Sequence, residues 1–359
     1  MKKQGQHIIF LCPYPQHGAP SQRFRYEQYL EILTKNGSSY EIHSFFDEPT
    51  NRILYKSGHA VQKVLGVING FLRRLLLIPR LSHADYLFIH REATPLGPPL
   101  LEWIIAKVLR KKIIYDFDDA IWLPDTSGVN TFMVRLKWQQ KVASICRWSY
   151  KVSCGNDYLC SFAQKFNEKV ILNPTTLDTE RQHNRLKDHH EAPLTIGWTG
   201  SHSTMKYLKE VENVLQQLEQ QYDFRFVVIS NRLPELALKS LVYIPWQEST
   251  EVEDLLQMHI GLMPLPDDPW SRGKCGFKAL QYLSLGIPAL VSPVGVNTSI
   301  VRHGENGFHC STEEDWLHYL RMLLNNPGLR IQMGEKGRKT VEATFSVRAN
   351  GDNFLSLFS

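Results

Sequence analysis

The sequence predicts an α/β protein built from two Rossmann-like domains that face a central cleft. Apolar runs of strand length alternate with helical patterns along the chain, which is typical of parallel sheets covered by helices. A polar, charged stretch interrupts this alternation near the middle of the chain, after which the alternation starts again. The 359 residues are also enough for two domains of ordinary size.

The first half of the chain predicts one such domain, residues 1–175. Helical patterns occupy residues 23–33, which Gly37 ends, and residues 98–109. The expected strands are residues 7–12, 39–46, 86–90, 112–116, 152–154 and 170–172.

Residues 176–193 predict a linker, because the stretch is polar, charged and nearly without large apolar side chains. A second Rossmann-like domain is expected over residues 194–345, and residues 346–359 are expected to pack back on the first domain. The strands expected in the second domain are residues 194–198, 224–230, 260–263 and 287–291, with helices at 205–221, 251–257, 277–285 and 313–324.

Composition narrows the class of protein. With 43% hydrophobic and 21% charged residues the chain has a globular composition. Its net charge of +5 is compatible with anionic substrates or an anionic membrane surface. No zinc-finger or RNA-binding pattern supports nucleic acid as a partner. The six cysteines include no CxxC pair, which favours reduced thiols and a cytoplasmic location. The N-terminus predicts a first strand rather than a signal peptide.

The stretch from residue 270 to 297 carries the clearest chemical pattern. A glycine-bearing cationic loop with Arg272, Lys274 and Gly276 leads into a short helix, and Lys278 lies one turn inside that helix. Helix N-termini offer unpaired N–H groups and a partial positive charge, so a phosphate would bind here. The alternative is that Lys278 is a solvated helix residue and Arg272 a surface loop residue.

Residues 276–293, GFKALQYLSLGIPALVSP, resemble the donor-site motif of the group 1 (family 4-like) glycosyltransferases, which have the GT-B fold. The family motif carries two glutamates eight residues apart, where this chain has Gly273 and Gln281. The resemblance implies a nucleotide-sugar-dependent transferase of polysaccharide or glycan biosynthesis that retains anomeric configuration and needs no metal. The alternative is a non-catalytic GT-B-like protein that binds sugar nucleotides; an epimerase of the same fold is a further rival.

The resemblance also assigns a donor site in the second domain. Gly200, Ser201 and Lys206 follow its first strand and would contact the diphosphate together with Lys278. Gln281 would approach the ribose. The alternative for the loop at Gly200 is a plain turn from strand to helix.

Three carboxylates, Asp116, Asp118 and Asp119, cluster at the end of an apolar strand of the first domain. Their pattern suggests a metal site of another glycosyltransferase fold, but the motif at residues 276–293 favours a metal-free site. The resemblance implies a catalytic residue, often a histidine, at the end of this strand, and Asp118 is its nearest equivalent by position. Asp118 is expected to be catalytic, together with Lys278, by binding an acceptor hydroxyl or the donor sugar. The alternative is a capping cluster for the following segment.

Two basic stretches of the first domain suggest contacts with an acceptor. Arg23 and Arg25 follow the first strand and could hold an anionic, lipid-linked acceptor, since a guanidinium suits phosphate oxygens. Residues 56–80 mix basic and apolar side chains in a pattern typical of a helix lying on the inner face of an anionic membrane. The alternatives are exposed helix arginines and a core-packed helix with a basic edge.

Overall fold

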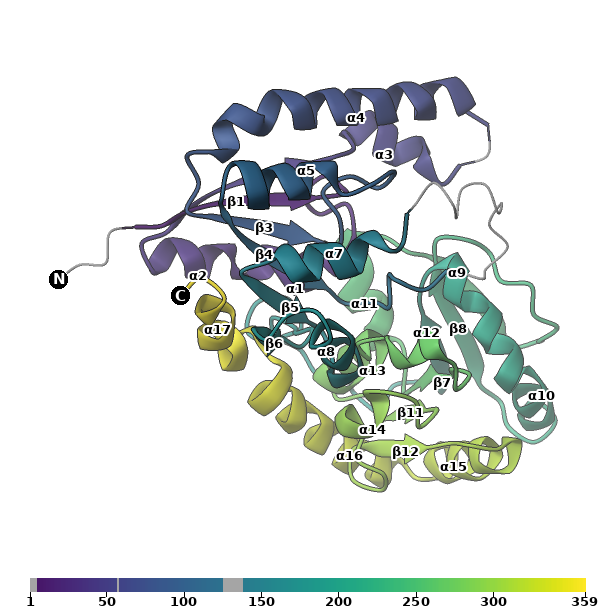
Figure 1. The fold of residues 1–359 in the computed structure, drawn as a ribbon. Helices are drawn as coiled ribbons and strands as arrows, with labels where there is room; N and C mark the ends of the chain where they lie inside the picture. The colour runs from purple at the N-terminus through teal and green to yellow at the C-terminus, as the bar shows by residue number, and fades with distance from the viewer. Residues whose placement is uncertain (1–4, 57, 125–137) are drawn as a thin grey trace. The chain divides into compact units, whose positions relative to one another are not determined.

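The computed structural model describes residues 5–56, 58–124 and 138–359. The chain divides into two compact units, one formed by Met1–Thr175 with Gly351–Ser359 and the other by Thr176–Asn350. Each unit contains one six-stranded sheet, and all its paired strands are parallel (Figure 1).

The sheet of the first unit has the order β2-β1-β3-β4-β5-β6. Its strands are β1 (His7–Cys12), β2 (Ser39–Ser44), β3 (Tyr86–His90), β4 (Lys112–Phe117), β5 (Lys151–Cys154) and β6 (Val170–Leu172). The connections are α1 (Pro20–Arg25), η1 (Glu27–Tyr29), α2 (Leu30–Lys35), α3 (Glu48–Leu54), α4 (Ala60–Leu81), α5 (Leu100–Trp103), η2 (Ile104–Val108), α7 (Lys141–Trp148) and α8 (Asp157–Ala163).

Helices cover both faces of this sheet. The strand order and right-handed crossovers place α4, α5 and α7 on one face and α1 and α2 on the other (Figure 1). The final helix, α17 (Val347–Ser356), ends beside α1 and α2, where Phe354 stacks on Tyr29 at 4.4 Å between ring centroids. Covering both faces explains why β3 and most of β4 are continuously buried.

The sheet of the second unit has the order β12-β11-β10-β7-β8-β9. Its strands are β7 (Thr195–Thr199), β8 (Arg225–Ser230), β9 (Leu241–Pro245), β10 (Ile260–Met263), β11 (Ala289–Val291) and β12 (Gly307–His309). The helices are α9 (His202–Met205), η3 (Lys206–Leu208), α10 (Lys209–Leu218), η4 (Glu248–Thr250), α11 (Glu251–Leu256), α12 (Pro269–Arg272), α13 (Phe277–Ser284), α14 (Asn297–Ile300), α15 (Glu313–Asn325), α16 (Pro327–Thr340) and η5 (Val341–Phe345).

Most expected strands occur within one or two residues of their predicted bounds, but β9 and β12 were not anticipated. β9 is a half-exposed strand at the sheet edge and β12 has three residues, so neither shows a long apolar run. The helix expected over residues 23–33 is interrupted at Tyr26, whose φ of −141° is not helical. Among the helices the structure describes, none has the length and apolar character needed to cross a membrane.

The stretch expected to be a linker instead belongs to the second unit, as the boundary falls before Thr176. Leu177 is fully buried, and its N–H donates to the Phe345 carbonyl at 2.9 Å. The Lys187 N–H donates to the Leu285 carbonyl at 2.8 Å, and Arg338 donates to the Thr179 carbonyl at 2.8 Å. The polar composition predicted a linker, but the backbone of the segment is hydrogen-bonded to the rest of the second unit and so belongs to it.

Candidate active site

In the second unit, the loop after β7 meets the first turn of α13. A Cβ atom added to Gly200 would lie 2.7 Å from Cε of Lys278 and equally near the Trp198 ring, so only glycine leaves room for the lysine side chain here. The Lys278 ammonium lies 5.4 Å from the centroid of the Trp198 indole, within the range of a cation–π contact. The two phosphate-binding patterns predicted from separate parts of the sequence therefore share one location.

The turn that starts α13 requires a glycine. Gly276 is the N-cap of the helix and has a left-handed φ of +68°. A Cβ atom there would also lie 2.2 Å from Cδ1 of Ile300, so a side chain would clash as well as strain the backbone. Through this turn the loop that contains Lys274 leads directly into the helix that carries Lys278.

The other predicted donor residues lie at the rim of the same unit. Ser201 is the N-cap of α9, but its hydroxyl pairs with that of Ser203 at 2.8 Å rather than with a helix amide. Lys206 is exposed, 5.3 Å from the ring centroid of Tyr207. These groups are accessible to an anion.

Arg272 is already paired with a carboxylate. Its Nε and Nη2 atoms donate to the two oxygens of Asp267 at 2.6 and 3.0 Å, and both side chains are about half exposed. The hydrogen bond and charge of Arg272 lower the pKa of Asp267. Lys274 lies 5.7 Å from the ring centroid of Trp270. Arg272 would have to release Asp267 before it could bind a phosphate. Lys278 lies beside Gly200, in the loop predicted to bind the diphosphate.

Gln281 is buried and donates from Nε2 to the Glu251 carboxylate at 3.2 Å. Glu251, the first residue of α11, also accepts from the Trp246 indole at 3.2 Å. A carboxylate therefore lies next to the position where the family motif has its second glutamate. Sequence reasoning missed Glu251, because only the fold brings α11 beside α13.

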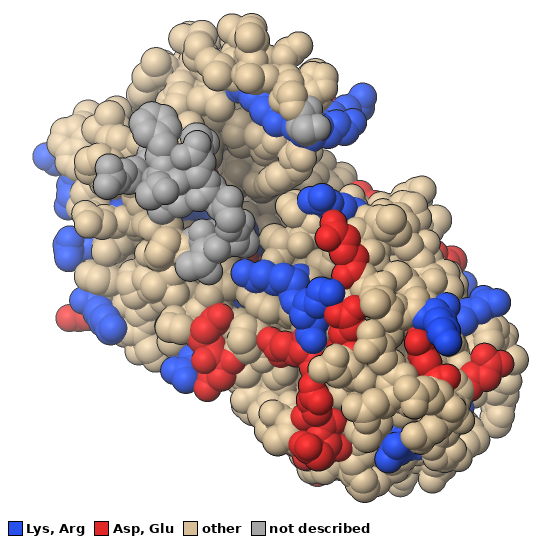
Figure 2. All heavy atoms as spheres, turned by 90° about the vertical axis from the view of Figure 1, so that its right-hand side faces the viewer, with Lys and Arg blue, Asp and Glu red and all other residues tan. Residues whose placement is uncertain are grey.

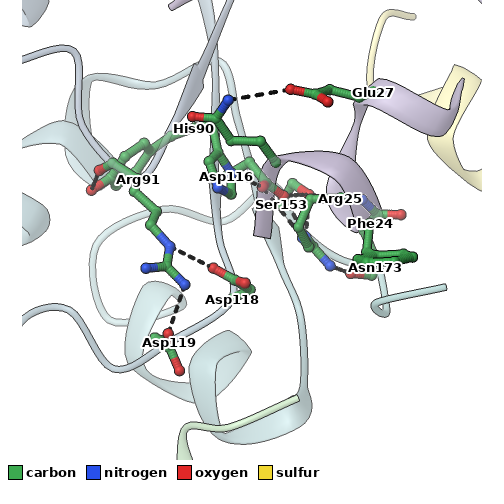
Figure 3. A network of polar contacts seen from close by, with 12 residues as sticks. Phe24, Arg25, Glu27, His90, Arg91, Asp116, Asp118, Asp119, Ser153 and Asn173 are labelled. Atoms are coloured by element: carbon green, nitrogen blue, oxygen red, sulfur yellow. Dashed lines mark hydrogen bonds and ion pairs between the residues drawn. The ribbon is translucent and has the colours of Figure 1, made fainter. Parts of the chain in front are cut away.

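In the first unit, β3 and β4 end in a polar network (Figure 3). His90 and Asp116 are register partners on these strands, and Nδ1 of His90 lies 2.8 Å from Oδ2 of Asp116. Asp116 also accepts from the Ser153 hydroxyl at 2.6 Å and from the Arg25 guanidinium. Nε2 of His90 has no hydrogen-bond partner in the described part of the chain. His90 was not predicted, although a histidine ending the apolar run YLFIH was a usable signal.

The expected role of Arg25 is wrong in this structure. Its side chain is fully inaccessible and donates to Asp116, to Ser153 at 3.3 Å and to the Asn173 carbonyl. A guanidinium with these partners holds the sheet together and cannot reach an acceptor. Arg23 is also buried, 4.8 Å from the ring centroid of Phe24.

The three carboxylates at the end of β4 pair with two different cations. Asp116 faces Arg25, whereas Asp118 and Asp119 accept from Nε and Nη2 of Arg91 at 2.8 and 2.6 Å (Figure 3). Arg91 has a left-handed φ of +58°, a strained conformation for an arginine. Burial would raise the pKa of Asp118, but the charge of Arg91 outweighs it and lowers that pKa. Burial would likewise raise the pKa of Asp116, but Arg25 and His90 outweigh it and lower that pKa.

Among the described residues, no group of three or more histidine, cysteine, aspartate or glutamate side chains is arranged to hold a metal ion. None of the six cysteines forms a disulfide, and all six are buried. Residues 125–137, which follow the carboxylate loop, lie outside the described ranges.

The fold of the chain is that of the GT-B glycosyltransferases. The chain is similar to sucrose-phosphate synthase from Thermosynechococcus elongatus at 12% identity, with a TM-score of 0.68 and 98% of each chain covered. It is also similar to HepE from Anabaena in complex with UDP and glucose, at 11% identity, a TM-score of 0.66 and 98% coverage of each. A third similar structure is the catalytic domain of starch synthase IV from Arabidopsis thaliana bound to ADP and acarbose, at 13% identity, with a TM-score of 0.67 and 99% of each chain covered.

Residues 180–340 match the family described as "Glycosyl transferases group 1". The whole of this match lies within the second unit, Thr176–Asn350. No curated protein sequence matched it.

Proposed function

We propose that the protein transfers a sugar from a nucleotide-sugar donor to a saccharide or lipid-linked acceptor in glycan biosynthesis, with retention of anomeric configuration. The observation that carries this proposal is the close approach of Gly200 and Lys278 in the unit that matches the family. Structures similar to this chain contain UDP or ADP, which supports a nucleoside diphosphate as the leaving group.

Lys278 would act on the leaving diphosphate. Negative charge grows on that group as the bond to the sugar breaks, and a cation held in place beforehand stabilises it without reorganisation. Trp198 and Gly200 fix the course of the Lys278 side chain. Ser201, Lys206, Lys274 and the N-terminal amides of α13 after Gly276 would complete the diphosphate contacts, and Arg272 would join them on leaving Asp267.

Glu251 and Gln281 would bind the donor ribose together. A neutral amide is a weaker acceptor for hydroxyl groups than a carboxylate. Because Gln281 donates to Glu251, the carboxylate is held beside the amide. In this chain the acid would come from α11 rather than from α13.

In the first unit, Asp118 is the proposed contact to the reacting sugars. His90 is fully buried, so it would hold Asp116 in place rather than touch a substrate. Asp118 is held ionised beside Arg91, and its carboxylate would position a hydroxyl or balance charge at the reacting sugar. No step of this proposal uses a metal ion.

The donor is best identified first, by thermal shift against UDP-, ADP- and GDP-sugars. A ligand at a hundredfold excess over its Kd stabilises the folded state by about 2.7 kcal/mol. Turnover of the stabilising donor, by transfer or by hydrolysis, then separates an enzyme from a protein that only binds sugar nucleotides.

Lys278→Ala should lower kcat by roughly 10²–10³, the range for loss of one preorganised transition-state contact. Lys209→Ala is a matched control, because Lys209 is an exposed helix lysine of the same unit that pairs with Glu212. A folded Lys278→Ala variant that turns over at the wild-type rate would refute the role of Lys278.

A further inference from the structure

Helix α4 exposes a continuous row of large apolar side chains. Its members recur every three or four residues, so they lie on one side of the helix. Exposure is high at both ends of the row, 70% for Val61 and 81% for Leu76. We define this apolar stripe as Val61, Val64, Leu65, Ile68, Phe71, Leu72, Leu75 and Leu76.

The opposite side of α4 is fixed to the sheet. Cβ atoms added to Gly66 and Gly70 would lie within 2.5 Å of the Thr50 and Phe45 side chains, so these glycines allow close packing. The buried Arg74 donates to the carbonyls of Cys12 and His43, both at 2.9 Å. The helix is therefore firmly seated, and the stripe faces outward as a consequence of the fold. A core-packed role for these residues is ruled out by their exposure.

A second exposed apolar cluster lies on the neighbouring connection. Leu100 and Trp103 of α5 and Val108 of η2 are exposed by 64%, 45% and 58%. Both helices are tied to Ala93, whose carbonyl accepts from Arg74 at 2.8 Å and whose N–H donates to Glu102 at 3.2 Å. They cover the same face of the sheet (Figure 1). We call the apolar stripe together with Leu100, Trp103 and Val108 the apolar platform.

Basic residues border the apolar platform. Helix α4 contains no aspartate or glutamate, and its basic residues nearest the stripe are Arg73 and Arg80, while Lys63 lies in line with Gly66 and Gly70 on the opposite side. Arg73 lies 3.6 Å from Asp47, and Arg80 lies 2.8 Å from Glu41, so these two are partly neutralised. Figure 2 shows blue side chains beside a broad tan surface on the upper lobe, where α3 and the start of α4 lie.

The second cluster adds charges without acidic partners. Lys107, Arg110 and Lys111 follow Trp103, and none of the three forms an ion pair within the described residues. An exposed tryptophan next to basic residues is typical of segments at a membrane–water interface. A surface of this kind attracts anionic lipid headgroups and gains further from burial of apolar side chains.

We propose that the apolar platform docks the protein on the surface of an anionic lipid bilayer, with α4 lying along the surface. The proposal rests on the proposed function in one respect, since a lipid-linked acceptor requires the enzyme to work at a membrane. A second copy of the chain fits less well, because a symmetric pairing of two platforms would bring their basic borders together. The charge at the border complements anionic lipid instead.

The test is sedimentation with vesicles of phosphatidylcholine alone or with about one third phosphatidylglycerol, at low and high salt. Wild type should bind the anionic vesicles at low salt, bind the neutral ones at least tenfold more weakly, and be partly released as salt rises, because salt screens headgroup attraction. Failure of wild type to bind anionic vesicles at low salt would overturn the proposal.

Two variants separate the apolar and the electrostatic contributions. Leu72→Asn with Leu76→Asn should weaken binding at least tenfold, whereas Lys107→Gln with Arg110→Gln should mainly reduce the preference for anionic lipid. Leu233→Asn, which changes a leucine of the second unit whose exposure lies between those of Leu72 and Leu76, is the control and should bind like wild type. Unchanged binding by the Leu72/Leu76 variant would contradict the proposal. Arg74 is unsuitable for substitution, because it holds three backbone carbonyls.

Two further measurements distinguish failure of membrane docking from failure of the proposed function and from self-association. Donor hydrolysis in the absence of lipid should be the same in the Leu72/Leu76 variant and wild type, so vesicle binding and the proposed function can fail independently. Sedimentation velocity without vesicles tests self-association: a wild-type dimer that the Leu72/Leu76 variant abolishes, with no vesicle binding, would assign the platform to a second copy and overturn membrane docking.

Discussion

Asp116 and Asp118 lie two residues apart in the sequence but have different surroundings. Asp116 is inside the sheet, where Arg25, His90 and Ser153 satisfy its oxygens. Asp118 lies just beyond the strand end and shares Arg91 with Asp119. Removing Asp116 would leave the buried Arg25 guanidinium without its carboxylate, whereas Asp118 can be changed with less effect on the fold.

Asp118→Asn should lower kcat about tenfold or more while leaving the melting temperature nearly unchanged. The substitution keeps the shape of the side chain and removes the charge that would face the reacting sugar. Asp119→Asn is the matched control, because it removes a carboxylate from the same guanidinium. Steady-state kinetics and thermal melts of both variants decide the matter. If Asp118→Asn melts earlier, and the folded fraction works normally, Asp118 only supports the following segment.

Individual site residues could be predicted from the sequence where a chemical group and a glycine required by the backbone occur in one pattern. Lys278 and Gly200 were predicted separately and do meet, because a phosphate-type loop needs both a cation and a close backbone approach. Arg25 could not be predicted correctly, because no local pattern shows that its guanidinium turns into the sheet toward Asp116. Glu251 escaped notice for a related reason, since its partner Gln281 is 30 residues away.

Among the elements, the segment before β7 is connected to the second sheet by two buried histidines. His189 donates from Nε2 to the Gly286 carbonyl at 2.8 Å. Next to β10, His259 accepts from the Thr195 N–H at 3.1 Å through Nδ1 and donates from Nε2 to the Glu191 carbonyl at 3.0 Å. Because Nδ1 of His259 accepts a hydrogen bond, that ring is neutral, whereas Nδ1 of His189 is buried without a hydrogen-bond partner in the described part of the chain. Burial, reinforced by nearby Arg330 and Lys187, lowers the pKa of each to about 4.

These histidines make the fold sensitive to mild acid. In the unfolded chain both titrate near the ordinary histidine pKa of 6.5, so between about pH 6.5 and 4 the unfolded state binds protons that the folded state does not. Stability should thus be unaffected by these two groups above pH 7 and should fall below pH 6.5. Each can contribute at most about 1.4 kcal/mol per pH unit.

Urea unfolding at pH 7.5 and 5.5 measures this loss, and the double variant His189→Gln with His259→Gln should show a clearly smaller one. Glutamine keeps a donor but does not titrate. Equal losses in the variant and wild type would show that other groups cause the acid sensitivity.

Element types were predictable where helical or strand periodicity is long and uninterrupted, as in β3 and α15. Breaks within helices were not, since the interruption at Tyr26 and the division between α9 and α10 depend on tertiary packing. The segment from Thr176 was assigned to a linker from its composition, although its polar groups are bonded inside the unit.

For the whole molecule, activity should survive exhaustive EDTA treatment. The proposed leaving-group stabilisation comes from Lys278 and neighbouring cations, and the carboxylates that suggest a metal site are engaged by Arg25 and Arg91. Donor turnover is measured before and after dialysis against the chelator. Complete loss that Mn²⁺ or Mg²⁺ specifically restores would favour a metal-dependent mechanism instead.

The division of the chain into two units has a consequence for its synthesis. Residues 351–359 belong to the first unit, yet they leave the ribosome only after the whole second unit has been made. Until then Tyr29 lacks its stacking partner Phe354, and Phe88 lacks Phe358. The first unit to be synthesised is therefore the last to be completed, and its aromatic face is open to chaperones or to aggregation while the second unit folds.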